Sequence, residues 1–148
     1  MNIQHLQTNG KAQSTGALMR KVVDTYYLDM VEYAGCSAIQ VFDILRKIPY
    51  RPDPKGTEAL MRPLYTLSMR GYGGDCDCKA IAMASWAKLV GIPYRFVAIR
   101  RTGRKNLHHV ATELYITTVH GSCWVFFDPT YSFNRWAEKR DEAERVYI

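Results

Sequence analysis

The order of apolar and polar residues divides the chain into a helical first part and a second part with the period of strands. Apolar residues recur at helical spacing from Ser14 to about Ala34 and again from Ser37 to Lys47, which predicts two amphipathic helices. Gly35, between them, is a helix-stop signal. Three prolines within residues 48–56 indicate extended or turning chain. A short helix is predicted over 63–69, where its first proline suits the first turn.

Residues 77–90 are apolar on almost every side. A surface helix would keep a polar stripe, so this helix is expected to be buried at the centre of the fold, ending at Gly91 and Pro93. The period then changes to two, and strands are predicted at 94–100, 109–119 and 123–129. The tail 135–148 is expected to form a last helix, and residues 1–13 a flexible N-terminus. Helices followed by an antiparallel sheet define the fold class α+β.

Length and composition fit one globular domain, which we place at residues 14–148. The chain has 148 residues, 47% of them hydrophobic and 23% charged, which excludes a disordered chain, a collagen-like repeat and a coiled coil. The longest uncharged apolar stretch, about Ala80–Ala87, is less than half the length of a membrane span. No secretion signal is recognisable. A cytoplasmic protein without a membrane partner is therefore expected.

The chain is basic, with 20 Lys and Arg against 14 Asp and Glu and a net charge of +6. The surplus is spread along the chain except for one cluster: Arg95, Arg100, Arg101, Arg104 and Lys105. Such a cluster attracts nucleic acid or an acidic partner, or it is a charged hairpin loop that keeps the protein soluble. Because no aromatic residues are interleaved and no nucleic-acid motif is present, we favour the loop and do not expect nucleic acid as a partner.

Four cysteines are too few for a disulfide framework, and one of them occupies a special place. Cys76 follows a glycine-rich segment and stands at the start of the predicted central helix. The helix dipole and the free backbone N–H groups there favour a thiolate and can stabilise an oxyanion. Cys36 and Cys123 lie in apolar stretches and are predicted to fill the core.

A thiolate nucleophile needs a base, and the base needs a group that orients it. His109 opens the second predicted strand and Asp128 ends the third. If these strands form a hairpin packed on the central helix, both side chains come near Cys76, and the order Cys, His, Asp is a workable thiol triad. The simpler alternatives are a solvated histidine at a strand end and an aspartate that only starts a turn before Pro129.

A zinc module is a competing hypothesis. Its ligands would be Cys76, Cys78, His108 or His109, and Cys123. The Cys-x-Cys spacing is tighter than in most zinc sites, and the sequence has no second cysteine pair. We therefore expect neither a metal nor another cofactor.

The segment "GDCDCKAIAMASWAKLVGIPYRF" (74–96) resembles the transglutaminase-like superfamily, in which a cysteine heads a helix that ends in GIP-x-R. The segments "HVATELYI" and "WVFFDPT" resemble the His and Asp segments of this superfamily. The preceding "IPYRPDPKG…GYGGDC" is similar to small members encoded among phage and prophage genes, although Cys78 stands where these have Asp. The resemblance covers roughly residues 38–134.

The resemblance implies a papain-like fold and a catalytic triad of Cys76, His109 and Asp128. It also implies an upstream oxyanion donor, for which Tyr50 and Tyr72 are both candidates. The expected activity is thiol-dependent acyl transfer from peptide or glutamine-type amides, with a protease, amidase or deamidase favoured over a cross-linking enzyme. The implied partner is a protein or peptide substrate, with a phage structural protein in the host cytoplasm as one candidate. The alternatives are a catalytically silent scaffold and a nucleic-acid-binding accessory protein that uses the basic loop 95–105.

Overall fold

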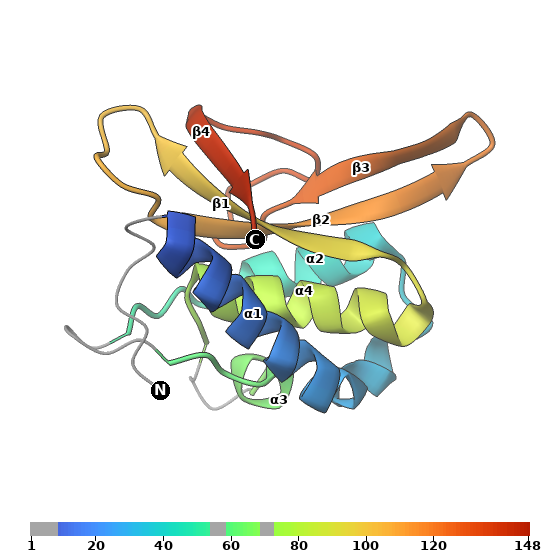
Figure 1. Ribbon diagram of the computed structural model, residues 1–148. Coiled ribbons are helices and arrows are strands. Elements are labelled where there is room, and N and C mark those ends of the chain that lie inside the picture. The colour runs from blue at the N-terminus through green and yellow to red at the C-terminus, as the bar shows by residue number, and fades with distance from the viewer. Residues whose placement is uncertain (1–8, 54–58, 69–72) are drawn as a thin grey trace.

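A computed structural model describes residues 9–53, 59–68 and 73–148. Helices lie on one face of a four-stranded antiparallel sheet whose order is β3-β2-β1-β4 (Figure 1). The elements are α1 (Asn9–Tyr26), the 3-10 helix η1 (Tyr27–Tyr33), α2 (Ala38–Lys47), α3 (Pro63–Thr66), α4 (Cys76–Val90), β1 (Tyr94–Arg101), β2 (His109–Thr118), β3 (Gly121–Phe127) and β4 (Glu142–Tyr147). The predicted α+β class and the order of helices before strands are confirmed.

The predicted central helix is α4, which lies below the sheet in Figure 1 and packs against β2 as well as against the other helices. Every residue from Cys78 to Ala87 is buried. The Asp75 side chain caps the helix by accepting a hydrogen bond from the Cys78 N–H at 3.3 Å. At the other end Gly91 adopts a left-handed conformation with φ of 80°, which favours glycine. On the sheet side, the Thr112 hydroxyl donates to the Ala80 carbonyl at 3.0 Å and fixes α4 against β2.

Helix α2 begins with a capping box. The Ser37 hydroxyl accepts a hydrogen bond from the Gln40 N–H, and the Gln40 side chain accepts one from the Ser37 N–H. These two contacts satisfy backbone donors that a helix leaves unpaired at its start. The helix buries Val41, Phe42 and Leu45 against α4 and the sheet.

The first helix differs from the prediction at both ends. It begins at Asn9, inside the segment expected to be flexible, because Ala12 packs fully buried in the same core cluster as the last residue, Ile148. The predicted single helix also changes to a 3-10 helix after Tyr26. There, the Trp86 indole of α4 donates to the Tyr33 carbonyl at 2.9 Å, a tertiary contact that helical periodicity does not reveal.

The predicted C-terminal helix is wrong, because the tail forms strand β4. This strand pairs antiparallel with β1, and the Ile148 N–H then donates to the Phe96 carbonyl at 3.1 Å. On the strand surface, Glu144 forms an ion pair with Arg100 at 3.0 Å. The charged residues of the tail are thus side chains of an edge strand, where charge discourages pairing with a further strand.

The basic cluster does not form one open patch. Arg95 pairs with the buried Glu113 at 2.7 Å, and its guanidinium lies over the Trp124 ring. Arg100 pairs with β4, and Arg101 donates to the Arg140 carbonyl at 2.8 Å. Three of the five cations are therefore engaged within the protein. Among the described residues, no helix is long and apolar enough to cross a membrane.

Candidate active site

Two glycines fix the approach to the start of α4. Gly74 donates to the Pro49 carbonyl at 3.3 Å and accepts from the Arg51 N–H at 3.1 Å. Gly73 has φ of 57°, and a Cβ there would lie 2.4 Å from the Pro49 oxygen. A Cβ on Gly74 would lie 2.7 Å from the Cys78 Cβ. Only glycine permits this close pairing, which sets residues 49–51 beside the first turn of α4.

Cys76 is the first residue of α4, and it is half-buried. Its Sγ donates to Asp77 Oδ1 at 3.1 Å. Cys76 packs against the core cluster that contains Val110, whose backbone N–H lowers the pKa of the thiol. Because Val110 follows His109 directly, the thiol lies beside the beginning of β2, where the predicted base stands.

His109 and Asp128 form a buried pair at the same end of the sheet. His109 Nε2 lies 2.7 Å from Asp128 Oδ2, and the Thr130 N–H and hydroxyl donate to Asp128 Oδ1 at 3.2 and 2.5 Å. Although burial opposes it, His109 and Thr130 hold the pKa of Asp128 below its usual value. Asp128 is thus a carboxylate that fixes the imidazole through Nε2. This leaves Nδ1 as the ring nitrogen that can exchange a proton with a thiol.

The electrostatics around Cys76 differ from the sequence-based expectation of a thiolate. Burial, together with the carboxylates of Asp77 and Asp75, raises the pKa of the Cys76 thiol well above its ordinary value. The Val110 N–H offsets this only in part. The helix N-terminus is therefore outweighed, and the thiol keeps its proton until a base takes it. The sequence shows both aspartates but not that their charges act on the sulfur.

Asp75 itself is an unusual acid. Its side chain is buried at the cap of α4, and burial with the charges of Asp77 and Asp53 raises its pKa to about 7. The site therefore carries a carboxyl group that changes charge near neutral pH, one residue away from the thiol.

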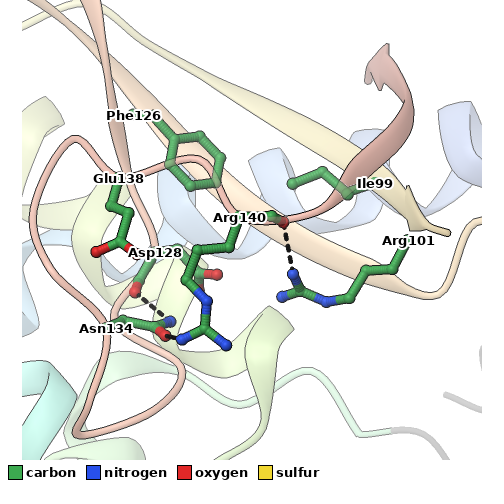
Figure 2. Close-up of a pocket in the computed structure, with 7 residues that line it drawn as sticks. All are labelled: Ile99, Arg101, Phe126, Asp128, Asn134, Glu138 and Arg140. Atoms are coloured by element: carbon green, nitrogen blue, oxygen red, sulfur yellow. Dashed lines mark hydrogen bonds between the residues drawn. The ribbon is translucent and has the colours of Figure 1, made fainter.

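The loop after β3 holds the backbone of Asp128 (Figure 2). Asn134 Nδ2 donates to the Asp128 carbonyl at 3.0 Å, and Arg140 Nη1 donates to Asn134 Oδ1 at 3.0 Å. Arg101 of β1 in turn donates to the Arg140 carbonyl at 2.8 Å. These side chains, with Ile99, line a small cavity. Sequence reasoning missed this network because its partners lie on a loop without a recognisable pattern.

A buried lysine was also missed. Lys79 lies one turn after Cys76, fully buried, and its Nζ donates to the Ile48 carbonyl at 2.6 Å and to the Thr130 carbonyl at 2.9 Å. Burial lowers the pKa of Lys79 to about 8, although the charge of Asp128 opposes this. The side chain thus joins the chain before Tyr50 to the loop that orients Asp128. In the sequence, the only indication of this residue is that a lysine stands in the first turn of a mostly apolar helix.

The two candidate oxyanion donors and the second cysteine of the Cys-x-Cys pair complete the set of predicted residues. Tyr50 forms a β-bridge with Gly74 beside the start of α4, and its side chain is partly exposed; burial and the neighbouring Tyr131 raise its pKa. Tyr72 lies outside the described residues. Cys78 is buried and its Sγ donates to a backbone carbonyl at 3.6 Å, as expected of a core residue.

The other two cysteines lie away from the thiol site. Cys36 is half-buried against the core of α2 and α4. Cys123 is exposed, contrary to the prediction. It lies on β3, where the β2–β3 hairpin extends beyond the helices and nothing covers it (Figure 1).

A cysteine at the start of a buried helix, together with a buried His–Asp pair on an antiparallel sheet, is the arrangement expected of a papain-like fold. A family model described as the transglutaminase-like superfamily matches residues 24–129, and the chain belongs to this superfamily. Among solved structures, the fold is similar to that of Legionella pneumophila LapG in its calcium-bound form. The TM-score is 0.52 at 19% sequence identity, over 78% of this chain and 73% of that chain. No curated protein matches the sequence.

Calcium belongs to the description of the LapG structure. Within residues 9–53, 59–68 and 73–148 of the present protein, no group of three or more His, Cys, Asp or Glu side chains could hold a metal ion. The donor set here does not fit such an ion, nor the predicted alternative of a zinc module.

Proposed function

We propose that this protein is a thiol-dependent acyl hydrolase that acts on peptide or glutamine-type amides through Cys76, His109 and Asp128. Membership of the transglutaminase-like superfamily favours an enzyme with peptidase-like thiol chemistry in general. The observation that carries the specific proposal is the buried 2.7 Å hydrogen bond between His109 and Asp128, next to Val110, which belongs to the core cluster against which Cys76 packs.

In the first half-reaction, His109 takes the thiol proton as Cys76 Sγ attacks the amide carbonyl carbon. The C–N bond then breaks, His109 gives the proton to the leaving amine, and the acyl group remains on sulfur as a thioester. Asp128 stabilises the imidazolium that forms in between. The backbone N–H groups at the start of α4 and the Tyr50 hydroxyl are candidates for stabilising the oxyanion, with Tyr72 as the alternative to Tyr50.

In the second half-reaction, water attacks the thioester carbon while His109 accepts its proton. The C–S bond breaks, the acid leaves, and the thiol is restored with the proton held by His109. An amine in place of water would give a new amide. We favour hydrolysis because Tyr50, which is bridged to Gly74 beside the first turn of α4, is 44% exposed, so this end of the site is open to water.

The test uses two substrates, denatured casein for peptide hydrolysis and a capped glutaminyl-glycine dipeptide for ammonia release. We expect the wild type to act on at least one, and Cys76→Ala to abolish the activity. Added hydroxylamine should divert the acyl group to a hydroxamate, which reports the thioester. Cys123→Ala removes an exposed thiol elsewhere and is the matched control. Equal activity in the wild type and in Cys76→Ala would contradict the proposal.

A further inference from the structure

A row of aromatic side chains leads from the thiol site onto the surface. Tyr50 forms a parallel β-bridge with Gly74, two residues before Cys76, and its ring centroid lies 5.2 Å from that of Tyr131. Tyr131 in turn stacks on Phe133 at 5.1 Å, with only 4° between the ring planes. The three rings therefore form a continuous surface that begins beside the nucleophile.

Beyond Phe133 the row opens into a groove between α2 and the loop after β3. The groove has a volume of about 550 Å³, within the range of ligand pockets. Asp43 and Arg46 line it from α2, and Phe133, Arg135 and Trp136 line it from the loop. The groove is therefore large enough for one or two amino-acid side chains and their backbone.

The aromatic side chains of this surface stay exposed although they are large and apolar. Phe133 is 62% exposed and Trp136 is 51% exposed. The loop that carries them is tied down: Arg46 Nη1 donates to the Ser132 carbonyl at 2.6 Å, and Lys79 Nζ donates to the Thr130 carbonyl at 2.9 Å. Phe133 contacts Tyr131 and the Arg140 guanidinium, yet most of its ring and half of Trp136 remain open to solvent on this fixed loop, as is typical of a binding surface.

The charges at the groove favour an acidic ligand group. Arg46 is paired with Asp43 at 2.6 Å, so these two charges largely cancel. Arg135 adds an exposed guanidinium and leaves the groove with a net positive charge. Complementary charge fixes the register in which a peptide binds and determines which peptides are preferred, more than it determines the overall affinity.

We propose that the aromatic row and the groove bind an extended peptide segment of the substrate. A large apolar side chain, best an aromatic one, lies against Phe133 and Trp136, and an acidic residue beside it faces Arg135. This inference rests on the proposed amide hydrolysis and names its substrate class. The two ring distances place Phe133 no more than about 10 Å from Tyr50, which an extended peptide spans in about three residues. The apolar residue is therefore expected three to four residues from the amide that is cleaved.

The first experiment exposes the protein to a peptide library made by digesting a bacterial proteome, and mass spectrometry identifies the cleaved bonds. For the wild type we expect Phe, Tyr and Trp to be enriched severalfold at one position, three or four residues from the cleaved bond, with Asp or Glu next to it. The double variant Phe133→Ala/Trp136→Ala should lose the aromatic enrichment. Trp124→Ala removes a partly exposed aromatic ring on β3 and should keep it.

The second experiment measures binding without turnover. Cys76→Ala is titrated with the capped peptides Phe-Glu-Gly-Gly and Ala-Glu-Gly-Gly, followed by chemical shifts. The Phe peptide should bind about tenfold more tightly, as the burial of an aromatic ring predicts, and the difference should vanish when Phe133 and Trp136 are replaced by Ala. Arg135→Glu should weaken binding of the Phe-Glu peptide and strengthen binding of a Phe-Lys one.

The outcomes separate this inference from the proposed function. Cleavage without positional preference, together with equal binding of the two peptides, would contradict the inference that the groove binds the substrate. It would leave the proposed hydrolase activity unaffected. Selective binding of the Phe peptide without any cleavage overturns the hydrolase and supports the groove as a peptide site. Binding of an oligosaccharide such as chitohexaose in preference to both peptides overturns the inference as well.

Discussion

The imidazole of His109 and the carboxylate of Asp128 are joined by a buried hydrogen bond of 2.7 Å, although 19 positions separate them in the sequence. The strands that carry them pair in a register that sets Thr112 opposite Phe127, which brings the start of β2 next to the residue after β3. Thr130 and Asn134 then hold the side chain and the backbone of Asp128. The pair is thus fixed before any substrate arrives, as acid–base chemistry at a thiol requires.

Asp128→Asn should lower kcat/KM by about two to four orders of magnitude, because the ring loses the charge that stabilises the imidazolium. Thr130→Val should lower kcat/KM by less, about tenfold, because one hydrogen-bond donor to Asp128 is lost while the carboxylate remains. The activity on casein or on the glutaminyl dipeptide gives both values. A Thr130→Val variant as impaired as Asp128→Asn would show that the loop has collapsed rather than that one hydrogen bond is missing.

Asp77→Asn should make the Cys76 thiol more reactive at neutral pH. The Asp77 carboxylate accepts from Sγ at 3.1 Å and is, after burial, the largest cause of the raised thiol pKa. Removing its charge lowers that pKa, so more thiolate is present at a given pH. The rate of iodoacetamide labelling, measured from about pH 6 to 10, should shift to lower pH. Labelling of the exposed Cys123 is the internal reference, and an unchanged Cys76 profile would contradict the assignment.

Asp75→Asn should change how stability depends on pH. The folded pKa of Asp75 is about 7 and its ordinary value is 3.8, so the native state holds a proton that the unfolded chain has lost between these values. This group therefore makes the protein less stable as the pH rises from about 4 to 7. The Asn variant keeps a side-chain oxygen that can accept from the Cys78 N–H, but it removes this loss of stability with rising pH. Urea unfolding across that range measures it, with the exposed Asp24→Asn as control.

The sequence predicts those parts of the fold and site that depend on local patterns. The buried helix α4 is visible as an unbroken apolar segment, and the start of α2 follows from Ser37 and Gln40. The triad residues stand out because each occupies the end of a predicted element. Their catalytic role remains a prediction, but the structure does bring His109 onto Asp128.

The features that escaped prediction depend on contacts between distant segments. Strand β4 exists because β1 has a free edge to which it can pair, and no local pattern in the charged tail indicates this. The raised pKa of Cys76 depends on where the carboxylates of Asp75 and Asp77 lie. A helix N-terminus alone predicts the opposite shift, so the orientation of two neighbouring side chains decides the state of the nucleophile.

Lys79→Met tests whether the buried lysine positions the site. The lysine joins the Ile48 and Thr130 carbonyls, and methionine has a similar volume but cannot donate to either. We expect kcat/KM to fall by about tenfold, since a displacement of about an ångström at the Asp128 loop is enough for such a loss. A purely structural role would reduce the free energy of unfolding and leave kcat/KM unchanged.

The pH dependence of stability gives the second readout for Lys79. Its folded pKa of about 8 lies below the ordinary 10.5, so in that window the native state has released a proton that the unfolded chain still holds. The wild type should therefore gain stability from Lys79 as the pH rises from about 8 to 10, and Lys79→Met should lack this gain. Urea unfolding of both proteins at pH values across this window measures the difference. Parallel curves would mean that the buried amine keeps its proton in the folded protein, and that the 2.6 and 2.9 Å contacts are made by an ammonium throughout.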